Sequence, residues 1–355
     1  MAGKYRFSFG PWNIHEGADP FGPPVRQTFG FDEKFSVYRK LGFEGVQFHD
    51  DDAVPDINRY SQKEVIERAR VMKKRLDEAE LTAEFVAPRL WEDARTIDGA
   101  YTSNNSKERQ YAIDRSRLAA DIARELDCDK MVLWLAREGT YIREAKNARL
   151  AVGRLVEAID AILDHSKEIK ILIEPKPNEP MDHAYLPTIG HAVATAYITK
   201  DPDRVGALVE TAHAYLAGQD PSDEMAYALA HKKLWSVHLN DQNGLKYDQD
   251  KAFGSANLRQ AFNQVRVLDE ADYGQGGEFV GLDVKAMRTQ PRDLSLKHLE
   301  NSKETFLHLL EKVRTLDKKV EKQFIDARDY EGLDQYIIRH LLGVKAPSSG
   351  SKKGK

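Results

Sequence analysis

Short apolar segments alternate with longer amphipathic segments along almost the whole chain. Apolar runs of four to six residues are typical of buried strands, whereas long charged segments with one apolar face are typical of surface helices. The pattern predicts eight strands, at residues 5–9, 45–48, 83–86, 131–134, 169–173, 205–209, 234–237 and 279–282.

A helix is expected after each strand. The predicted helices cover residues 32–40, 62–80, 106–126, 147–167, 188–198, 221–232 and 258–271, and residues 295–344 are expected to be helical without a further strand. Asp32 is placed to cap the first of these helices.

Strands that alternate with helices pair in parallel, and eight such units without a glycine-rich nucleotide turn predict a (β/α)8 TIM barrel of the α/β class. The chain therefore divides into a (β/α)8 barrel catalytic domain at residues 1–300 and a C-terminal helical arm at residues 301–346. Residues 347–355 contain mainly Ser, Gly and Lys and are predicted to be a disordered tail.

The composition is that of a soluble globular protein. Hydrophobic residues make up 41% of the 355 residues and charged residues 31%. The net charge of −4 argues against a nucleic-acid partner, since dedicated nucleic-acid binders usually carry a basic excess. No apolar run approaches the roughly 20 residues of a membrane span, and the N-terminus lacks the apolar core of a signal peptide. We therefore expect no membrane partner and a cytoplasmic location.

Cys128 is the only cysteine, so an intrachain disulfide is impossible. It lies between an apolar helix end and a strand, which predicts a buried, inert thiol rather than a nucleophile.

Polar side chains stand where the predicted strands end. In a TIM barrel the C-terminal ends of the strands converge on the active site. Unpaired charges at such buried positions are strongly unfavourable, so acids and imidazoles there indicate chemistry rather than structure. The residues at these ends are His49, Trp91, Trp134, Glu174, Glu210, His238 and Asp283.

Carboxylates and imidazoles without cysteine suit Mg²⁺, Mn²⁺ or Co²⁺ better than a structural zinc ion. Two metal sites can be assembled. One takes Glu174, Glu210, His238 and Asp283, and the other takes Glu210 as a bridge together with His213, Asp248 and Asp250. The second set is plausible because Glu210 and His213 share one short turn and the two aspartates form a DxD loop.

Each residue also has an ordinary structural explanation when it is taken alone. Glu174 could pair with Lys176, His213 could be a hydrogen-bonded loop residue, and residues 248–250 could form a solvated turn. Residues 50–52 could cap the following helix, and the tryptophans could be core residues. The joint placement of these groups at one rim favours the metal interpretation.

Six motifs resemble the D-xylose isomerase family of metal-dependent aldose–ketose isomerases. They occur in the family's order over nearly the whole chain: FHDDD (48–52), REG (137–139), IEPKPNEP (173–180), LPTIGHA (186–192), QNGLKYDQD (242–250) and LDQYIIRHLLG (333–343).

The resemblance implies two divalent metal ions and a hydride shift between C1 and C2 of a linear sugar. It implies that His49 and Asp52 assist ring opening and that Lys176 stabilises O1. The matching ligands are Glu174, Glu210 and Asp283 for one metal, and Glu210, His213, Asp248 and Asp250 for the other.

The resemblance also implies an aromatic sugar pocket and an oligomer. Trp12 and Trp134 match its walls, and Trp91 stands where the family has a phenylalanine. Phe21 matches a phenylalanine that enters the site of a neighbouring subunit, so a homodimer or homotetramer is expected.

Besides Trp91, further positions depart from the family pattern. His238 replaces an aspartate ligand, which makes the first site less negative and favours softer ions such as Mn²⁺, Co²⁺ or Zn²⁺. Arg89 stands near an expected small polar residue, Leu208 near an expected asparagine, and Ala286-Met287 replaces a Pro-Pro pair.

These departures indicate a substrate pocket that differs from that of the family. The presence of histidine at position 238 is similar to the pattern of rhamnose isomerases and ketose 3-epimerases. The leading hypothesis is a metal-dependent aldose–ketose isomerase with a small sugar substrate. The alternatives are a sugar epimerase or a keto-sugar lyase on the same barrel and, further off, a DNA-repair endonuclease or a non-catalytic sugar-binding protein.

Overall fold

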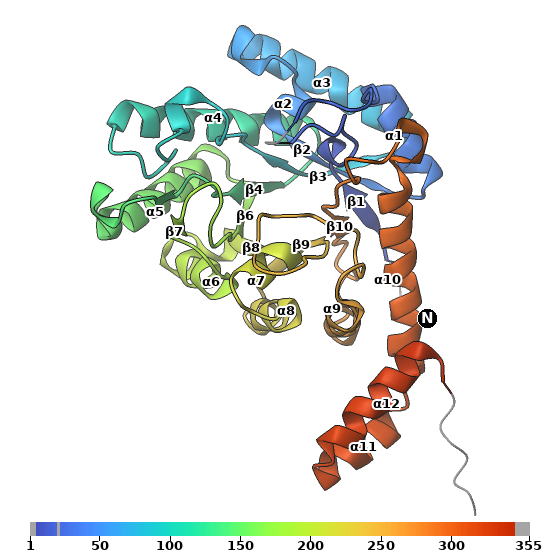
Figure 1. Ribbon diagram of the computed structural model, residues 1–355. Helices are drawn as coiled ribbons and strands as arrows, with labels where there is room; N and C mark the ends of the chain where they lie inside the picture. The colour runs from blue at the N-terminus through green and yellow to red at the C-terminus, as the bar shows by residue number, and fades with distance from the viewer. Residues whose placement is uncertain (1–4, 20–21, 345–355) are drawn as a thin grey trace, which may run out of the picture.

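The computed structural model describes residues 5–19 and 22–344, which form a closed barrel of parallel strands with helices outside it (Figure 1). The strand order around the barrel is β1-β10-β9-β8-β6-β4-β3-β2. The predicted (β/α)8 barrel is therefore confirmed. The strands are β1 (Phe7–Phe9), β2 (Gly45–His49), β3 (Thr82–Ala87), β4 (Lys130–Trp134), β6 (Lys170–Glu174), β8 (Val205–Glu210), β9 (Leu234–Leu239) and β10 (Val280–Leu282).

The outer layer consists of helices that lie close to their predicted positions. They are α1 (Phe31–Lys40), α3 (Gln62–Glu78), α4 (Ser106–Glu125), α5 (Ala148–His165), α6 (Ile189–Ile198), α8 (Pro221–Ala230), α9 (Leu258–Glu270) and α10 (Lys297–Thr315). One detail was wrong: α1 begins at Phe31 after Gly30, so Asp32 lies in its first turn and does not cap it.

Two short helices were not predicted. The helix α2 (Asp50–Ala53) begins directly at the end of β2, and α7 (Thr211–Leu216) begins directly at the end of β8. Both helices lie at the rim of the barrel. They carry candidate site residues, Asp52 on α2 and His213 on α7.

Alternation along the strands decides which side chains enter the barrel. Leu172 and Leu208 point inward and pack together, whereas the residues beside them face the helices. Two residues further along each strand stand Glu174 and Glu210, which therefore point into the barrel at its C-terminal rim. Below them, the buried carboxylate of Glu84 accepts hydrogen bonds from residues of three other strands, namely Ser8, Gln47 and Ser236.

A small antiparallel sheet, which the sequence pattern did not predict, lies above the rim. It pairs β5 (Gly139–Thr140) with β7 (His183–Ala184). The pairing ties the loop that follows β4 to the loop that follows β6.

The chain ends in α11 (Lys318–Ala327) and α12 (Tyr330–Leu342), which lie to one side of the barrel (Figure 1). The expected boundary at residue 300 falls inside α10, whose Phe306 packs edge-to-face on Tyr5 and Phe7. The barrel's last helix thus continues into the arm, and the domain limits stay a prediction. The predicted tail at residues 347–355 and Phe21 lie outside the described residues.

The thiol of Cys128 is buried, and burial raises its pKa to about 12, which agrees with an inert thiol. Among the helices of the described ranges, none combines the length and the apolar character needed to cross a membrane.

Candidate metal centre

The first predicted set of ligands meets at the rim of the barrel around His238. Its Nδ1 atom lies 3.5 Å from Glu174 Oε1, 3.6 Å from Glu210 Oε2 and 3.8 Å from Asp283 Oδ2. Ligand atoms that bind one ion at about 2.1 Å are themselves separated by about 3.0–3.5 Å. The four side chains therefore need only small adjustments to hold one ion.

The second predicted set meets on the other side of Glu210. The carboxylates of Glu210, Asp248 and Asp250 gather within a span suited to one cation. His213 Nε2 lies 3.3 Å from Glu210 Oε1 and 3.0 Å from Asp248 Oδ2, and His213 Nδ1 lies 3.6 Å from Glu174 Oε1. Glu210 thus belongs to both clusters, as the sequence predicted.

Buried polar atoms without partners show that the two clusters fit metal ions. Both ring nitrogens of His238, the Nδ1 of His213 and the Oδ1 of Asp248 are buried and lack a hydrogen bond within the described chain. Burying such polar atoms without a hydrogen-bond or metal partner costs free energy. Divalent cations could bind one ring nitrogen of each histidine and the Asp248 carboxylate, and these roles as ligands stay a prediction.

The electrostatics of the centre also favour added positive charge. Burial raises the pKa of Asp250 to about 8, and the neighbouring Asp248 contributes to this rise. Burial and the charge of Asp248 likewise hold the pKa of Glu210 well above its usual range. For Glu174 burial acts in the same direction, but His238 and His213 outweigh it and lower the pKa to about 2.

Lys176 lies against the second cluster, where its carboxylate partners are Asp248 and Glu179 and not Glu174, whose pairing with Lys176 was the alternative explanation. Its Nζ atom donates to Asp248 Oδ2 at 2.9 Å and lies 3.3 Å from Glu179 Oε2. Burial alone would lower the pKa of Lys176, but these two carboxylates raise it, so the amine stays an ammonium ion.

Asn240, which sequence reasoning did not assign to the site, holds both clusters together. It is fully buried, and its amide nitrogen donates to Glu210 Oε1 and to Asp250 Oδ1, each at 3.0 Å. Its side-chain oxygen accepts from the backbone N–H of Ala212 at 2.8 Å. The only signal in the sequence is its position two residues after His238, directly beyond the end of β9.

Asp283 is held from the loop after β1. The indole N–H of Trp12 donates to Asp283 Oδ1 at 2.9 Å, and the amide of Asn13 donates to the same atom at 2.7 Å. Trp12 was expected to be a wall of the sugar pocket, and it also orients this candidate ligand.

The predicted aromatic residues form a continuous wall along one side of the rim. The ring centres of Trp12 and His49 are 4.2 Å apart, those of His49 and Trp91 are 5.0 Å apart, and those of Trp91 and Trp134 are 4.5 Å apart. The ammonium of Lys176 lies 5.0 Å from the centre of the Trp134 ring. The wall therefore runs from the FHDDD motif to the metal centre.

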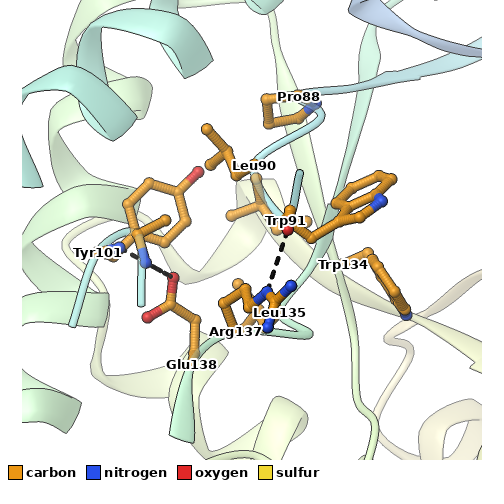
Figure 2. A pocket seen from close by; sticks show the side chains of 10 residues that line it. Pro88, Leu90, Trp91, Tyr101, Trp134, Leu135, Arg137 and Glu138 are labelled. Carbon is orange, nitrogen blue, oxygen red and sulfur yellow. Dashed lines mark hydrogen bonds between the residues drawn. The ribbon is translucent and has the colours of Figure 1, made fainter. Parts of the chain in front are cut away.

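The loops behind this wall are tightly held (Figure 2). Arg137 Nε donates to the backbone oxygen of Trp91 at 3.1 Å, and the Glu138 carboxylate accepts the backbone N–H groups of residues 100–102. These contacts fix the positions of Trp91 and Trp134 relative to the barrel.

The three aspartates of FHDDD have different partners. Asp50 is fully buried and forms an ion pair with Arg115, Asp51 accepts from Arg89, and Asp52 Oδ2 lies 2.8 Å from His49 Nδ1. Their expected role as a simple helix cap is therefore incomplete. His49, Asp51 and Asp52 are close enough to bind a cation, but the Arg89 guanidinium already contacts them.

The family described as the xylose isomerase-like TIM barrel matches residues 35–299, and the chain belongs to this family. This family is broader than the D-xylose isomerases, and membership of that narrower group stays a proposal.

Solved structures that resemble the chain differ widely in their activities. D-Psicose 3-epimerase with D-tagatose, from Clostridium cellulolyticum H10, has 12% identity and a TM-score of 0.61, and the match covers 87% of this chain and 99% of that one. The IOLI protein with a bound zinc atom has 14% identity, a TM-score of 0.59 and coverages of 88% and 100%. An AP endonuclease of family 2 from Brucella melitensis has 17% identity, a TM-score of 0.56 and coverages of 82% and 97%. At these identities the likeness is one of fold.

Proposed function

We propose that the chain is a divalent-metal-dependent aldose–ketose isomerase that acts on a small sugar of the xylose type. The observation that carries this proposal is the pair of carboxylate–imidazole clusters that share Glu210 and lie beside the ammonium of Lys176. Moving hydrogen between adjacent carbons of a sugar places negative charge on its oxygens, and the ammonium of Lys176, together with the cations that the two clusters would hold, would stabilise such charge.

The two ions, Mg²⁺, Mn²⁺ or Co²⁺, would supply Lewis-acid stabilisation of the sugar oxygens when bound by the two clusters. The neutral imidazole of His238 favours Mn²⁺ or Co²⁺ over Mg²⁺. Lys176 stays protonated, so it acts as a hydrogen-bond donor to an anionic oxygen and not as a base. Trp91 and Trp134 offer an apolar surface to the carbon face of the sugar and exclude water from it.

The partner expected here is a small sugar and not a nucleic acid. The chain carries a net charge of −4, which disfavours association with the phosphate backbone of DNA. We further expect the protein to act in the cytoplasm as a homo-oligomer.

A second candidate function is a metal-dependent ketose epimerase. Two observations favour it: His238 at the first cluster, and the fold likeness to a D-psicose 3-epimerase. An epimerase removes and returns a proton at one carbon, and the carboxylates of Glu174 and Asp283, 3.5 Å and 3.8 Å from His238 Nδ1, are groups of the kind that transfer protons.

Turnover in D₂O distinguishes these functions. The protein is loaded with Mn²⁺, Co²⁺ or Mg²⁺ and incubated with a panel of aldoses and ketoses, and the products are analysed by NMR. A hydride shift interconverts aldose and ketose without solvent deuterium entering the carbon chain. Epimerisation through proton transfer places deuterium at the inverted carbon, and a lyase gives a dehydrated product.

Glu210→Gln is expected to abolish turnover, because both clusters lose their shared carboxylate. Glu92→Gln is a control, since Glu92 is exposed and lies outside both clusters. If no sugar of the panel is converted with any of the three ions, the isomerase proposal fails.

A further inference from the structure

Arg89 is anchored at several points near the FHDDD motif. Its backbone N–H donates to Asp50 Oδ1 at 3.1 Å, and its Nε donates to Asp51 Oδ1 at 2.7 Å. Its Nη1 donates to Glu92 Oε1 at 3.2 Å. With these contacts made, the remaining nitrogen, Nη2, lies 2.6 Å from the Nδ1 atom of His49.

The Nδ1 atom of His49 therefore has two neighbours with opposite requirements. A guanidinium can only donate a hydrogen bond, so Arg89 requires a lone pair on Nδ1. The Asp52 carboxylate, 2.8 Å from the same atom, would require a hydrogen there. A neutral imidazole can meet only one of these requirements, and the choice sets what the other nitrogen offers to a substrate.

The surrounding contacts favour a hydrogen bond from Arg89 to His49 Nδ1 over one from His49 Nδ1–H to Asp52. The Oδ2 atom of Asp52 already accepts the backbone N–H of His49 at 3.1 Å and lies 3.6 Å from Arg89 Nη2, so its charge is compensated without a hydrogen on Nδ1. The other acceptor that faces Nη2, Asp52 Oδ2, lies 3.6 Å away, farther than His49 Nδ1 at 2.6 Å, and the Arg89 side chain is only 18% exposed.

We propose that Arg89 is a positioning residue that fixes His49 as an Nε2–H donor, so that the site takes the open-chain carbonyl form of a sugar and does not open a ring. With hydrogen on Nε2, His49 donates to a carbonyl or alkoxide oxygen and cannot remove the proton of an anomeric hydroxyl. The second half of this inference rests on the proposed function.

The position of the His49 ring agrees with this role. The ring packs between Trp12 and Trp91, in the wall that leads to the metal centre. Its Nε2 has no hydrogen-bond partner among residues 5–19 and 22–344 and is the nitrogen left for a substrate. Arg89 itself is surrounded by Asp51, Asp52 and Glu92, so its charge does not call for an anionic substrate.

The first test reads the tautomer directly. Two-bond ¹H–¹⁵N correlation spectra of ¹⁵N-histidine-labelled protein distinguish the Nε2–H form, the Nδ1–H form and the imidazolium, and His49→Gln identifies the signal. We expect the Nε2–H form at pH 8 in the wild-type protein and in the control Glu67→Gln, since Glu67 is exposed on the outer helix α3. In Arg89→Met, the hydrogen should move to Nδ1, where it can bond to Asp52.

A wild-type spectrum showing Nδ1–H or imidazolium overturns the proposal, and so does an unchanged tautomer in Arg89→Met. If Arg89→Met does not fold, Arg89→Lys serves in its place. It keeps a positive charge near Asp51, but its single ammonium group cannot bond to Asp51 and His49 together.

The second test asks whether the enzyme depends on an open-chain substrate. A ketotetrose has too few carbons to close a five-membered hemiketal ring, whereas a ketohexose is mostly cyclic. The measured quantity is the ratio of kcat/KM for the ketotetrose to kcat/KM for the ketohexose. A general base contributes on the order of 100-fold to proton transfer, so the ratio should fall by about tenfold or more in Arg89→Met, where His49 gains a basic Nε2.

An unchanged ratio in Arg89→Met contradicts the open-chain inference. The two proposals fail differently. Absence of metal-dependent turnover with every aldose and ketose of the panel rejects the proposed function, whereas the tautomer spectrum tests the role of Arg89 without any turnover.

Discussion

Glu210 is the residue on which the candidate metal centre depends most. It ends β8, points into the barrel and lies within reach of His213, His238 and Asp250. A residue shared by two clusters should couple them, because removing its charge weakens both at once.

We therefore expect Glu210→Gln and Asp283→Asn to differ in metal stoichiometry. Wild-type protein dialysed against Mn²⁺ should retain two ions per chain. Asp283 belongs only to the His238 cluster, so Asp283→Asn should retain about one ion, whereas Glu210→Gln should retain neither tightly. Elemental analysis after dialysis measures this, and equal losses in both variants would contradict the shared position of Glu210.

Asn240 is expected to matter for metal binding although it is not a ligand. Loss of groups that orient metal ligands typically reduces metal affinity by about 10- to 100-fold. Asn240→Ala removes two donors to candidate ligands and leaves the N–H of Ala212 without its acceptor. We expect such a loss of affinity in calorimetry, and a loss of about 1–3 kcal/mol in the free energy of unfolding.

Asn104→Ala is the matched control, because Asn104 is exposed and its amide bonds only to a backbone oxygen. An Asn240→Ala variant that binds metal as tightly as this control would show that the carboxylates hold their positions alone.

The raised pKa of Asp250 predicts a pH-dependent response to metal. An aspartate in an unfolded chain has a pKa of about 4, whereas burial raises that of Asp250 to about 8. Protonation of Asp250 stabilises the metal-free folded protein. This contribution is complete below about pH 4 and is lost as the pH rises through 8. Metal binding needs the ionised carboxylate and therefore displaces the proton.

The increase in Tm on adding Mn²⁺ should consequently be larger at pH 8 than at pH 6. Thermal unfolding with and without metal at the two pH values measures the difference. Glu174, with a pKa of about 2, does not titrate in this range. An equal increase at both pH values would contradict the prediction.

At the scale of elements, the β5–β7 sheet positions the loops around Trp134 and Lys176. Gly139 lies in β5 where a Cβ atom would collide with the backbone oxygen of His183 in β7. The close approach of the two strands therefore requires glycine at this position.

We expect Gly139→Ala to separate the two strands and to lower the free energy of unfolding by about 1–3 kcal/mol. KM for the sugar should rise more than kcat falls, because the wall residue Trp134 shifts while the ligands stay in place. Gly153→Ala is the control: Gly153 lies on α5 with no atom close to the added methyl group, and alanine there should stabilise by about 0.5–1 kcal/mol. Equal effects of the two substitutions would contradict the proposed role of the sheet.

For the whole molecule, the helical arm offers the clearest surface for association. Salt bridges such as Arg266–Glu321 hold the arm to α9, and Ile337 is buried. Several large apolar side chains of the arm remain exposed, among them Tyr330 at 61% and Leu342 at 70%.

We expect the full-length protein to form a homodimer or homotetramer through this arm, and light scattering at micromolar concentration measures the mass. Burying a leucine contributes about 2 kcal/mol, so Leu342→Glu should shift the equilibrium towards monomer. Val71→Glu, on the distant helix α3, should not. A monomeric wild-type protein contradicts the expectation.

The sequence by itself determined the barrel and the membership of the two clusters. Strand side chains alternate, and parallel strands in a barrel end at one rim, so an acid two residues beyond an inward leucine must point into the centre. Leu172 with Glu174 and Leu208 with Glu210 follow this rule, and it needs no knowledge of distant neighbours.

Only the tertiary structure decided how the surrounding polar groups are paired. Asn240 bonds to carboxylates from two different segments, Lys176 bonds to Asp248 rather than to Glu174, and Arg89 reaches back to His49 from the next strand. These contacts join residues that are tens of positions apart, and their partners depend on loop conformations that no local periodicity encodes. The proposed tautomer of His49 therefore depends on Arg89, a residue that lies outside the FHDDD motif.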